Sequence, residues 1–206
     1  MASPSQVFEF FSKLSTLIDW AKIDKDKVQQ LIREAPRVAR EFVKFVENGG
    51  QAGVVKYIIN LLVAPFPEEW NESDGWKIDE HDVGTGELEW DPSKVNLYLS
   101  TEQSDGKSMT GHDLRKEIKD KKIPVLNACV LEFLLAHPFL IPESWKMPGY
   151  IFFWGTIYRL SGGDLYVRCL CSRDDRWHWS HRWLGNDWID CNLAALRAMP
   201  DGGQAS

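Results

Sequence analysis

The stretch RWHWSHRWLGNDWIDCN, residues 176–192, alternates its largest side chains with small or polar ones. Alternate residues of a β-strand point to the same face, so Trp177, Trp179 and Trp183 share one side of a strand. Each buried indole removes a large apolar area from water and stabilises a small sheet. We therefore predict that these tryptophans are core pillars rather than a stacking platform for a ligand. The residues between them then form an outward polar surface: His178, Ser180 and Arg182.

The overall composition is that of an ordinary folded protein, and it narrows the classes of function. The 206 residues carry a net charge of −6, which argues against a nucleic-acid binder. The longest apolar stretch, 54–66, is interrupted by Lys56 and Asn60 and is too short to span a bilayer, so no membrane insertion is expected. Four cysteines without a secretion leader indicate reduced thiols and a cytoplasmic protein.

The first 66 residues read as a helical arm or bundle. Ser5 can cap a first helix, and Asp24 or Asp26 can cap a second one that Pro36 should kink or divide. Gly49-Gly50 ends that second helix, and a third is predicted over 52–62. Two roles stay open for this segment: an arm for docking or homo-oligomerisation, and a helical layer that covers a sheet.

Residues 70–200 read as a second domain, of mixed composition. Thr110 opens a helix with Asp113 at its third position, which is a capping-box pattern, and Pro124 begins a more buried helix. Gly, Asp and Pro separate short strand candidates over 76–82, 87–90 and 95–99. Longer strands are expected over 150–159, 164–171 and 176–184. The sequence therefore predicts an α+β protein: a helical segment, then a domain with two helices and a C-terminal antiparallel β-meander.

Two features of the C-terminal part bear on function. From Pro148 to Ala198 there is no Lys, Glu, Gln or Met, although surface strands normally use Lys and Glu freely. The same part holds a group of soft and borderline metal ligands, but their spacing matches none of the usual zinc patterns well. These ligands are Cys169, Cys171, His178, His181 and Cys191.

No catalytic motif is present in the sequence: we find no Gly-rich phosphate loop, Gly-x-Ser-x-Gly elbow or His-Glu-x-x-His. We therefore expect no enzyme activity, no bound metal and no cofactor. Two alternatives stay open. One is an intracellular enzyme or metal-binding domain that uses the Cys/His group, and the other is a structural adaptor that acts through its N-terminal helices.

Several longer segments carry a family resemblance. The chain resembles a group of bacterial proteins whose C-terminal part looks like a fixed frame with changeable positions, and this pattern is similar to the variable proteins of diversity-generating retroelements. The segments that carry the resemblance are Trp90-Asp91, Lys94-Val95, Leu97-Tyr98-Leu99-Ser100, Gly111-His112-Asp113-Leu114-Arg115-Lys116-Glu117, Pro124-Val125-Leu126-Asn127-Ala128, Ile141-Pro142-Glu143-Ser144-Trp145-Lys146 and Phe152-Phe153-Trp154-Gly155-Thr156-Ile157-Tyr158-Arg159. The resemblance covers roughly residues 76–198 and leaves out the helical arm.

The resemblance implies a C-type-lectin-type fold whose frame displays diversified residues. Such retroelements rewrite adenines, typically in AAC codons, and codons that end in a pyrimidine cannot encode Trp, Lys, Glu, Gln or Met. The implied frame includes Trp154, Trp177, Trp179, Trp183 and Trp188. The implied variable positions, called slots below, are Leu160, Asp164, Cys169, Cys171, Ser172, Arg173, Asp174, Asp175, His178, Ser180, His181, Asn186, Ile189, Asp190, Cys191 and Asn192.

The function that this resemblance implies is non-enzymatic binding of a protein or another macromolecule. The chain departs from sugar-binding C-type lectins in two respects. Asn186-Asp187-Trp188 has the wrong order for their calcium-binding triplet, and no Glu-Pro-Asn loop is present. We therefore expect no calcium-dependent sugar binding.

Overall fold

The computed structural model describes residues 24–47, 56–70, 72–146 and 149–197, together with single residues between Gln6 and Thr16. Internal contacts divide the chain into two units, residues 1–55 and 56–206. The expected helical arm of residues 1–66 is therefore too long at its C-terminal end. None of the described helices is both long and apolar enough to cross a membrane.

In the first unit, two helices follow one another directly: α2 (Lys25–Arg33) and α3 (Ala35–Glu47). The Asp24 carboxylate accepts the backbone N–H of Asp26, as expected for a residue that caps α2. Pro36 lies in the first turn of α3, where its missing N–H costs nothing. The predicted division at Pro36 is confirmed. Most of the first predicted helix, and the Gly49-Gly50 end of the second, lie outside the described residues.

The third predicted helix is wrong for its last part, because residues 57–60 form strand β1 (Tyr57–Asn60). β1 pairs antiparallel with β3 (Glu87–Trp90), with Tyr57 opposite Trp90. Ile59 is buried whereas its neighbour Ile58 is half exposed, which is the period of a strand and not of a helix. The residues of this prediction before Lys56 lie outside the described part.

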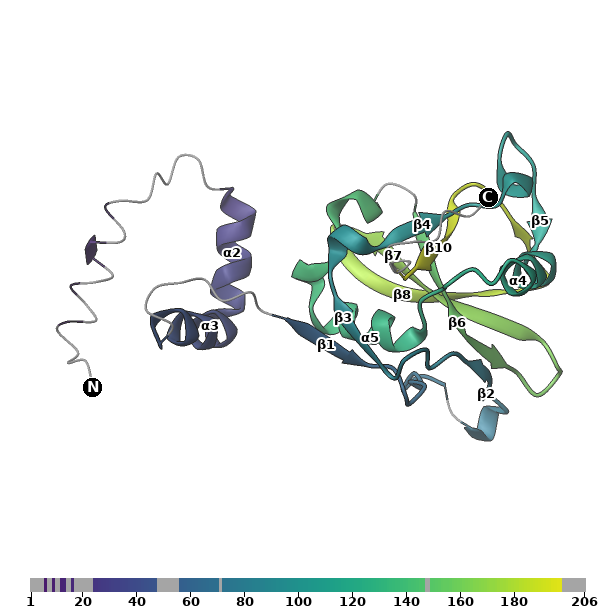
Figure 1. The fold of residues 1–206 in the computed structure, drawn as a ribbon, viewed down its shortest axis with the longest axis horizontal. Coiled ribbons are helices and arrows are strands. Elements are labelled where there is room, and N and C mark those ends of the chain that lie inside the picture. The colour runs from purple at the N-terminus through teal and green to yellow at the C-terminus, as the bar shows by residue number, and fades with distance from the viewer. Residues whose placement is uncertain are drawn as a thin grey trace. The chain divides into compact units, whose positions relative to one another are not determined.

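A six-stranded mixed sheet forms the centre of the second unit (Figure 1). Its main order is β4-β10-β6-β7-β8, and β2 pairs with the far half of β6. Its strands are β2 (Lys77–His81), β4 (Asn96–Tyr98), β6 (Tyr150–Arg159), β7 (Leu165–Arg173), β8 (Arg176–Trp183) and β10 (Asn192–Leu196). The α+β class and the β6-β7-β8 meander are as predicted. β10 was not predicted, and it returns between β4 and β6, parallel to β6.

Both predicted helices of the second unit are present. α4 (Gly111–Asp120) begins after Thr110, whose hydroxyl accepts the backbone N–H of Asp113, as the capping pattern indicated. α5 (Ala128–Ala136) begins four residues later than expected, at the Asn127 cap, because Leu126 bonds to the backbone of β10 and β6 instead. The short elements are β5 (Met109–Thr110), β9 (Asp187–Trp188) and 3-10 turns over Glu72–Asp74, Pro92–Lys94, Thr101–Gln103, Pro138–Leu140 and Glu143–Lys146.

The two helices lie on opposite faces of this sheet, and each face has its own apolar core (Figure 1). On one face, Leu131 and Leu134 of α5 pack with Leu170 of β7. On the other, Leu114 and Ile118 of α4 belong to a core that includes Trp188. Because both faces are covered, β6 is buried along almost its whole length, which explains its near-continuous apolar sequence.

Candidate ligand-binding surface

The β7-β8 hairpin carries most of the predicted slots. Its two strands pair without interruption from Tyr166 opposite Trp183 to Arg173 opposite Arg176. Residues that stand opposite each other point to the same face, so the hairpin has two distinct sides. The tryptophan face consists of Tyr166, Arg168, Leu170, Ser172, Trp177, Trp179, His181 and Trp183. The polar face consists of Val167, Cys169, Cys171, Arg173, Arg176, His178, Ser180 and Arg182.

The tryptophans of the predicted frame differ in their surroundings. Trp154 and Trp188 are buried in the core on the α4 side, and Trp177 and Trp179 are half-buried against the core on the α5 side. Trp183, in contrast, is 39% exposed, so the prediction that it is a core pillar is wrong. The reason is its position at the end of the outermost strand, where its ring lies over Gly185.

His181, a predicted slot, is on the tryptophan face and is exposed. Its ring lies 5.1 Å from that of Trp70 and 5.5 Å from that of Tyr166. Trp70 in turn stacks on Trp76, with ring centroids 3.9 Å apart. Burial lowers the pKa of His181, and the nearby Arg168 guanidinium lowers it further. The odd residue number, which His181 shares with the tryptophans of the strand, was the signal for this placement.

Sequence reasoning missed Arg168, which lies under the tryptophan face and is only 1% exposed. Its guanidinium lies 4.4 Å from the centre of the Trp179 ring, and its Nη1 is 2.6 Å from a Glu132 carboxylate oxygen of α5. A buried charge without such a partner would be costly, so this ion pair and stacking hold β7, β8 and α5 together. The sequence did contain a signal. Arg168 is the one charged residue between Leu165 and Cys171, and alternation along the strand places it on the same side as Leu170.

On the polar face, burial separates the two cysteines from their neighbours. Cys169 is 1% and Cys171 8% exposed, which contradicts their prediction as surface slots, whereas His178 is exposed and Ser180 half-buried. The cysteines point toward the sheet face that α4 covers, and Cys169 is part of that core. Burial raises the pKa of both thiols, so they stay protonated at neutral pH.

The tip of the hairpin is a tight two-residue turn made by Asp174 and Asp175, with φ angles of 51° and 56°. This left-handed conformation suits Asn-Gly far better than two consecutive aspartates. Both carboxylates are exposed, as are the flanking Arg173 and Arg176. The tip therefore presents charged side chains on a backbone that is not optimised for stability.

The remaining slots lie in three places. The β6-β7 turn contains Leu160, which is half-buried, and Asp164, which is exposed. β7 separates this turn from the hairpin tip, and its length corresponds to about 26 Å. Ile189, Asp190 and Cys191 precede β10, whose Asn192 pairs with Tyr150; Tyr150 pairs with Cys171, so this loop lies toward the tip. The slots therefore do not form one contiguous face, because they include both ends of β7. Asn186 is exposed just beyond β8.

Asn192 is another slot that the structure contradicts, because it is 2% exposed and serves the backbone. Its side-chain oxygen accepts the N–H of Ile189 at 3.1 Å, and its own N–H donates to the Ile189 carbonyl. The buried Gln103 amide donates to the carbonyls of both residues. The amide of Asn192 thus closes the turn that leads into β10.

The Cys/His group does not come together as a metal site. Cys169, Cys171 and His178 are on the polar face, whereas His181 is on the opposite face of the same sheet. Across the part of the chain that the structure describes, no group of three or more His, Cys, Asp or Glu side chains is arranged to hold a metal ion. The geometry therefore does not favour the metal-binding alternative.

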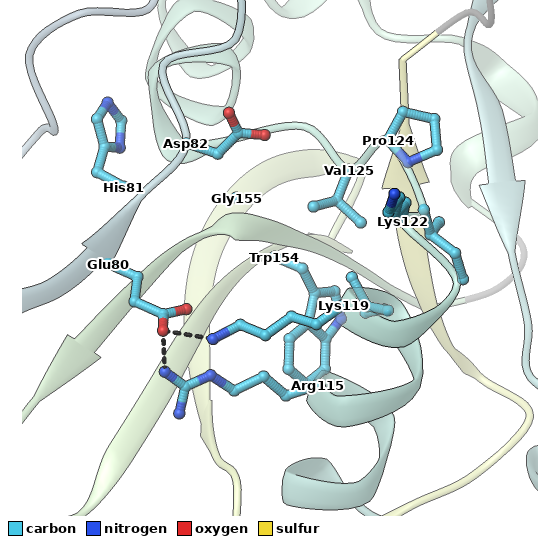
Figure 2. Close-up of a pocket in the computed structure, with 12 residues that line it drawn as sticks. Glu80, His81, Asp82, Arg115, Lys119, Lys122, Pro124, Val125, Trp154 and Gly155 are labelled. Carbon is cyan, nitrogen blue, oxygen red and sulfur yellow. Dashed lines mark hydrogen bonds and ion pairs between the residues drawn. The ribbon is translucent and has the colours of Figure 1, made fainter.

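A cavity of about 590 Å³ lies away from the hairpin, between the end of β2 and α4 (Figure 2). Figure 2 shows the Glu80 carboxylate bridging Arg115 and Lys119 beside the Trp154 ring. Asp82, at the same cavity, pairs with Arg197. Because these charges already satisfy one another and no predicted slot lines the cavity, we place the candidate function on the hairpin and its neighbouring loop.

We expect Asn192→Ala to lower the free energy of unfolding by about 1–3 kcal/mol, because it removes a buried amide that accepts the Ile189 N–H and leaves that N–H without its acceptor. The matched control is Asn186→Ala, an exposed slot of the same residue type, which should change stability by less than about 0.5 kcal/mol. Urea denaturation of the two variants measures the difference. Equal changes in the free energy of unfolding would show that the buried contacts of Asn192 do not stabilise the protein.

We expect the lowered pKa of His181 to make stability pH-dependent. The folded protein prefers the neutral ring, so this contribution is complete above the unfolded pKa of about 6.5 and is lost as the pH falls below it. The loss of stability between neutral pH and mildly acidic pH should therefore be smaller in His181→Gln. An NMR titration that places the His181 pKa above that of an unfolded histidine would contradict the account.

In comparisons with protein-family models, curated proteins and solved structures, nothing matches this chain.

Proposed function

We propose that this chain is a non-enzymatic binding protein that recognises a macromolecule through the exposed slots of the β7-β8 hairpin and the loop before β10. The observation that carries the proposal is the separation of two classes of residue in one hairpin. A buried frame holds the strands, and exposed polar residues that contribute little to the core stand between its members. The exposed slots of this surface are Arg173, Asp174, Asp175, His178, Ile189 and Asp190, and His181 is exposed on the opposite face of β8.

The physical merit of this arrangement is tolerance to change. Substitutions of exposed residues usually alter stability by less than about 0.5 kcal/mol, whereas truncation of a large core side chain costs about 3–5 kcal/mol. A frame made of Trp179, Arg168 and Trp188 can therefore present many different surfaces, as antibody loops do on a fixed sandwich. Cys169, Cys171 and Asn192 belong to this frame in our proposal.

We further propose that the second unit has a C-type-lectin-type fold and that its slots are diversified by a retroelement. Two observations support this. Two helices precede a β-meander. AAC-derived codons cannot encode Trp, Lys, Glu, Gln or Met, and of these five residue types the segment with slots contains only tryptophan. The tryptophans belong to the frame in this proposal, so their codons would remain unchanged.

The proposed target is a macromolecule because the hairpin offers charge and hydrogen-bond donors on an exposed surface. Small-molecule sites are usually concave and mostly apolar. The described cavity is lined by none of the slots. A protein surface, in contrast, matches an exposed patch of arginine, aspartate and histidine with a polar rim.

The retroelement part predicts a specific arrangement in the DNA. The gene should be accompanied by a near-copy of its 3′ end that differs at adenines, and by a gene for a reverse transcriptase. Sequencing of the flanking DNA checks both. Slot codons that end in a purine would contradict the proposal, because rewriting the adenines of an AAC codon leaves its final pyrimidine unchanged.

The binding part is tested with a pool of full-length variants in which only Arg173, Asp174, Asp175, His178 and Asp190 are randomised. We expect most members to keep the parental thermal midpoint and some to bind a chosen test protein, because these side chains are exposed. A control pool randomises an equal number of exposed positions in α2 and α3, and it should yield no binders. Widespread unfolding of the first pool, or equal numbers of binders from both, would contradict the proposal.

A further inference from the structure

β8 is the last strand of its sheet, so one side of its backbone has no partner strand. The two-residue turn at Asp174-Asp175 and the hydrogen bond from the Leu184 N–H to the Leu165 carbonyl determine which residues of β8 bond to β7 through their backbone. Even-numbered residues of β8 therefore bond to β7, and the backbone groups of Trp177, Trp179 and His181 point outward. Within the described residues, no backbone group from outside the strand bonds to these three.

This edge lacks the usual devices that prevent pairing with other chains. Natural edge strands are shortened, bulged, or interrupted by lysine and proline. β8 is eight residues long, contains no Lys, Pro or Gly, and pairs with β7 in unbroken register. An unprotected edge of this length is a template for the addition of a further strand.

The arginines of the hairpin differ from all others in the second unit. Arg115, Arg159, Arg168 and Arg197 each pair with a carboxylate. Among the described residues, no carboxylate forms an ion pair with the three arginines of the polar face: Arg173, Arg176 and Arg182. Arg173 and Arg176 are exposed, whereas Arg182 is half-buried. Its guanidinium donates to the Asp187 carbonyl at 2.6 Å and lies 5.7 Å from the centre of the Trp188 ring, so its charge has no acidic partner in the described part of the chain. β8 itself contains no acidic residue. The edge therefore combines open hydrogen-bonding groups with uncompensated positive charge.

We infer that β8 binds an extended acidic peptide segment of its partner as an added strand. Arg176 and Arg182 are six residues apart, which is about 20 Å along a strand, and they point to the same face. They occupy the non-hydrogen-bonded positions relative to an added strand, where opposed side chains come closest. Carboxylates six residues apart in the partner can thus face both arginines.

The other side of the added strand favours apolar residues. They would lie beside Trp177 and Trp179, which are only half-buried, and would remove more of the indole surface from water. A second copy of this chain fits less well than an acidic peptide, because an antiparallel β8 centred on Trp179 sets Arg176 opposite Arg182. This inference rests on the proposed function, since it names the kind of partner for the same hairpin.

The test uses the full chain and a capped synthetic peptide, Glu-Val-Thr-Val-Thr-Val-Glu, whose sequence reads the same in both directions. Its control is the same peptide with Lys in place of Glu. We expect the acidic peptide to slow amide hydrogen exchange at Trp177, Trp179 and His181 by about tenfold at saturation. It should also bind about tenfold more tightly than the lysine peptide at low salt. Unchanged exchange at these amides overturns the inference, and equal affinities overturn its acidic specificity.

Two variants separate the backbone from the side chain. His181→Pro removes one outward N–H without breaking the ladder to β7, whereas His181→Ala keeps that N–H. We expect only the proline variant to lose about tenfold in affinity for the acidic peptide. Equal losses in both overturn the inference. If the slot pool yields binders whose binding never protects the edge amides, the proposed function stands and strand addition fails. If neither experiment shows binding, both are wrong.

Discussion

The burial of β6 on both faces and along both edges is the constraint on which the rest of the second unit depends. β7 covers one edge of β6, while β10 and β2 share the other. α5 packs on one face and the core on the α4 side fills the other. Apart from its two ends, this strand is buried, so its position is set by hydrophobic burial and by backbone pairing along both edges. The hairpin that carries the slots extends from this strand.

The outer strand β8 depends on a different interaction. It is held to the sheet by its ladder with β7 and, on one face, by Trp179 over the Arg168 guanidinium. Arg168 is neutralised by Glu132 from α5, so a helix, two strands and an indole share one buried charge. Because these contacts lie under the tryptophan face, the outward side chains of the strand contribute little to the stability of the fold. That division is what a surface open to change requires.

In our proposal, the charges of the hairpin contact a partner outside the chain. A paired arginine contributes to its own fold, whereas Arg173 and Arg176 are exposed and have no acidic partner among the described residues. The tip turn, with two aspartates in the left-handed region, stores backbone strain at the same end of the hairpin. The cavity beside α4 shows the opposite state, since its acids Glu80 and Asp82 already pair with basic side chains.

Local signals in the sequence determined the caps of α2 and α4, the division at Pro36, and the strands β6, β7 and β8, because capping and side-chain periodicity act over a few residues. The same alternation also gives the face of the sheet on which His181 and Arg168 lie. Only the tertiary structure decided that residues 57–60 pair with β3, that β10 enters beside β6, and that Cys169 and Asn192 are buried. These outcomes depend on partners far away in the chain, and local pattern carries no information about which distant backbone or core will meet a given residue.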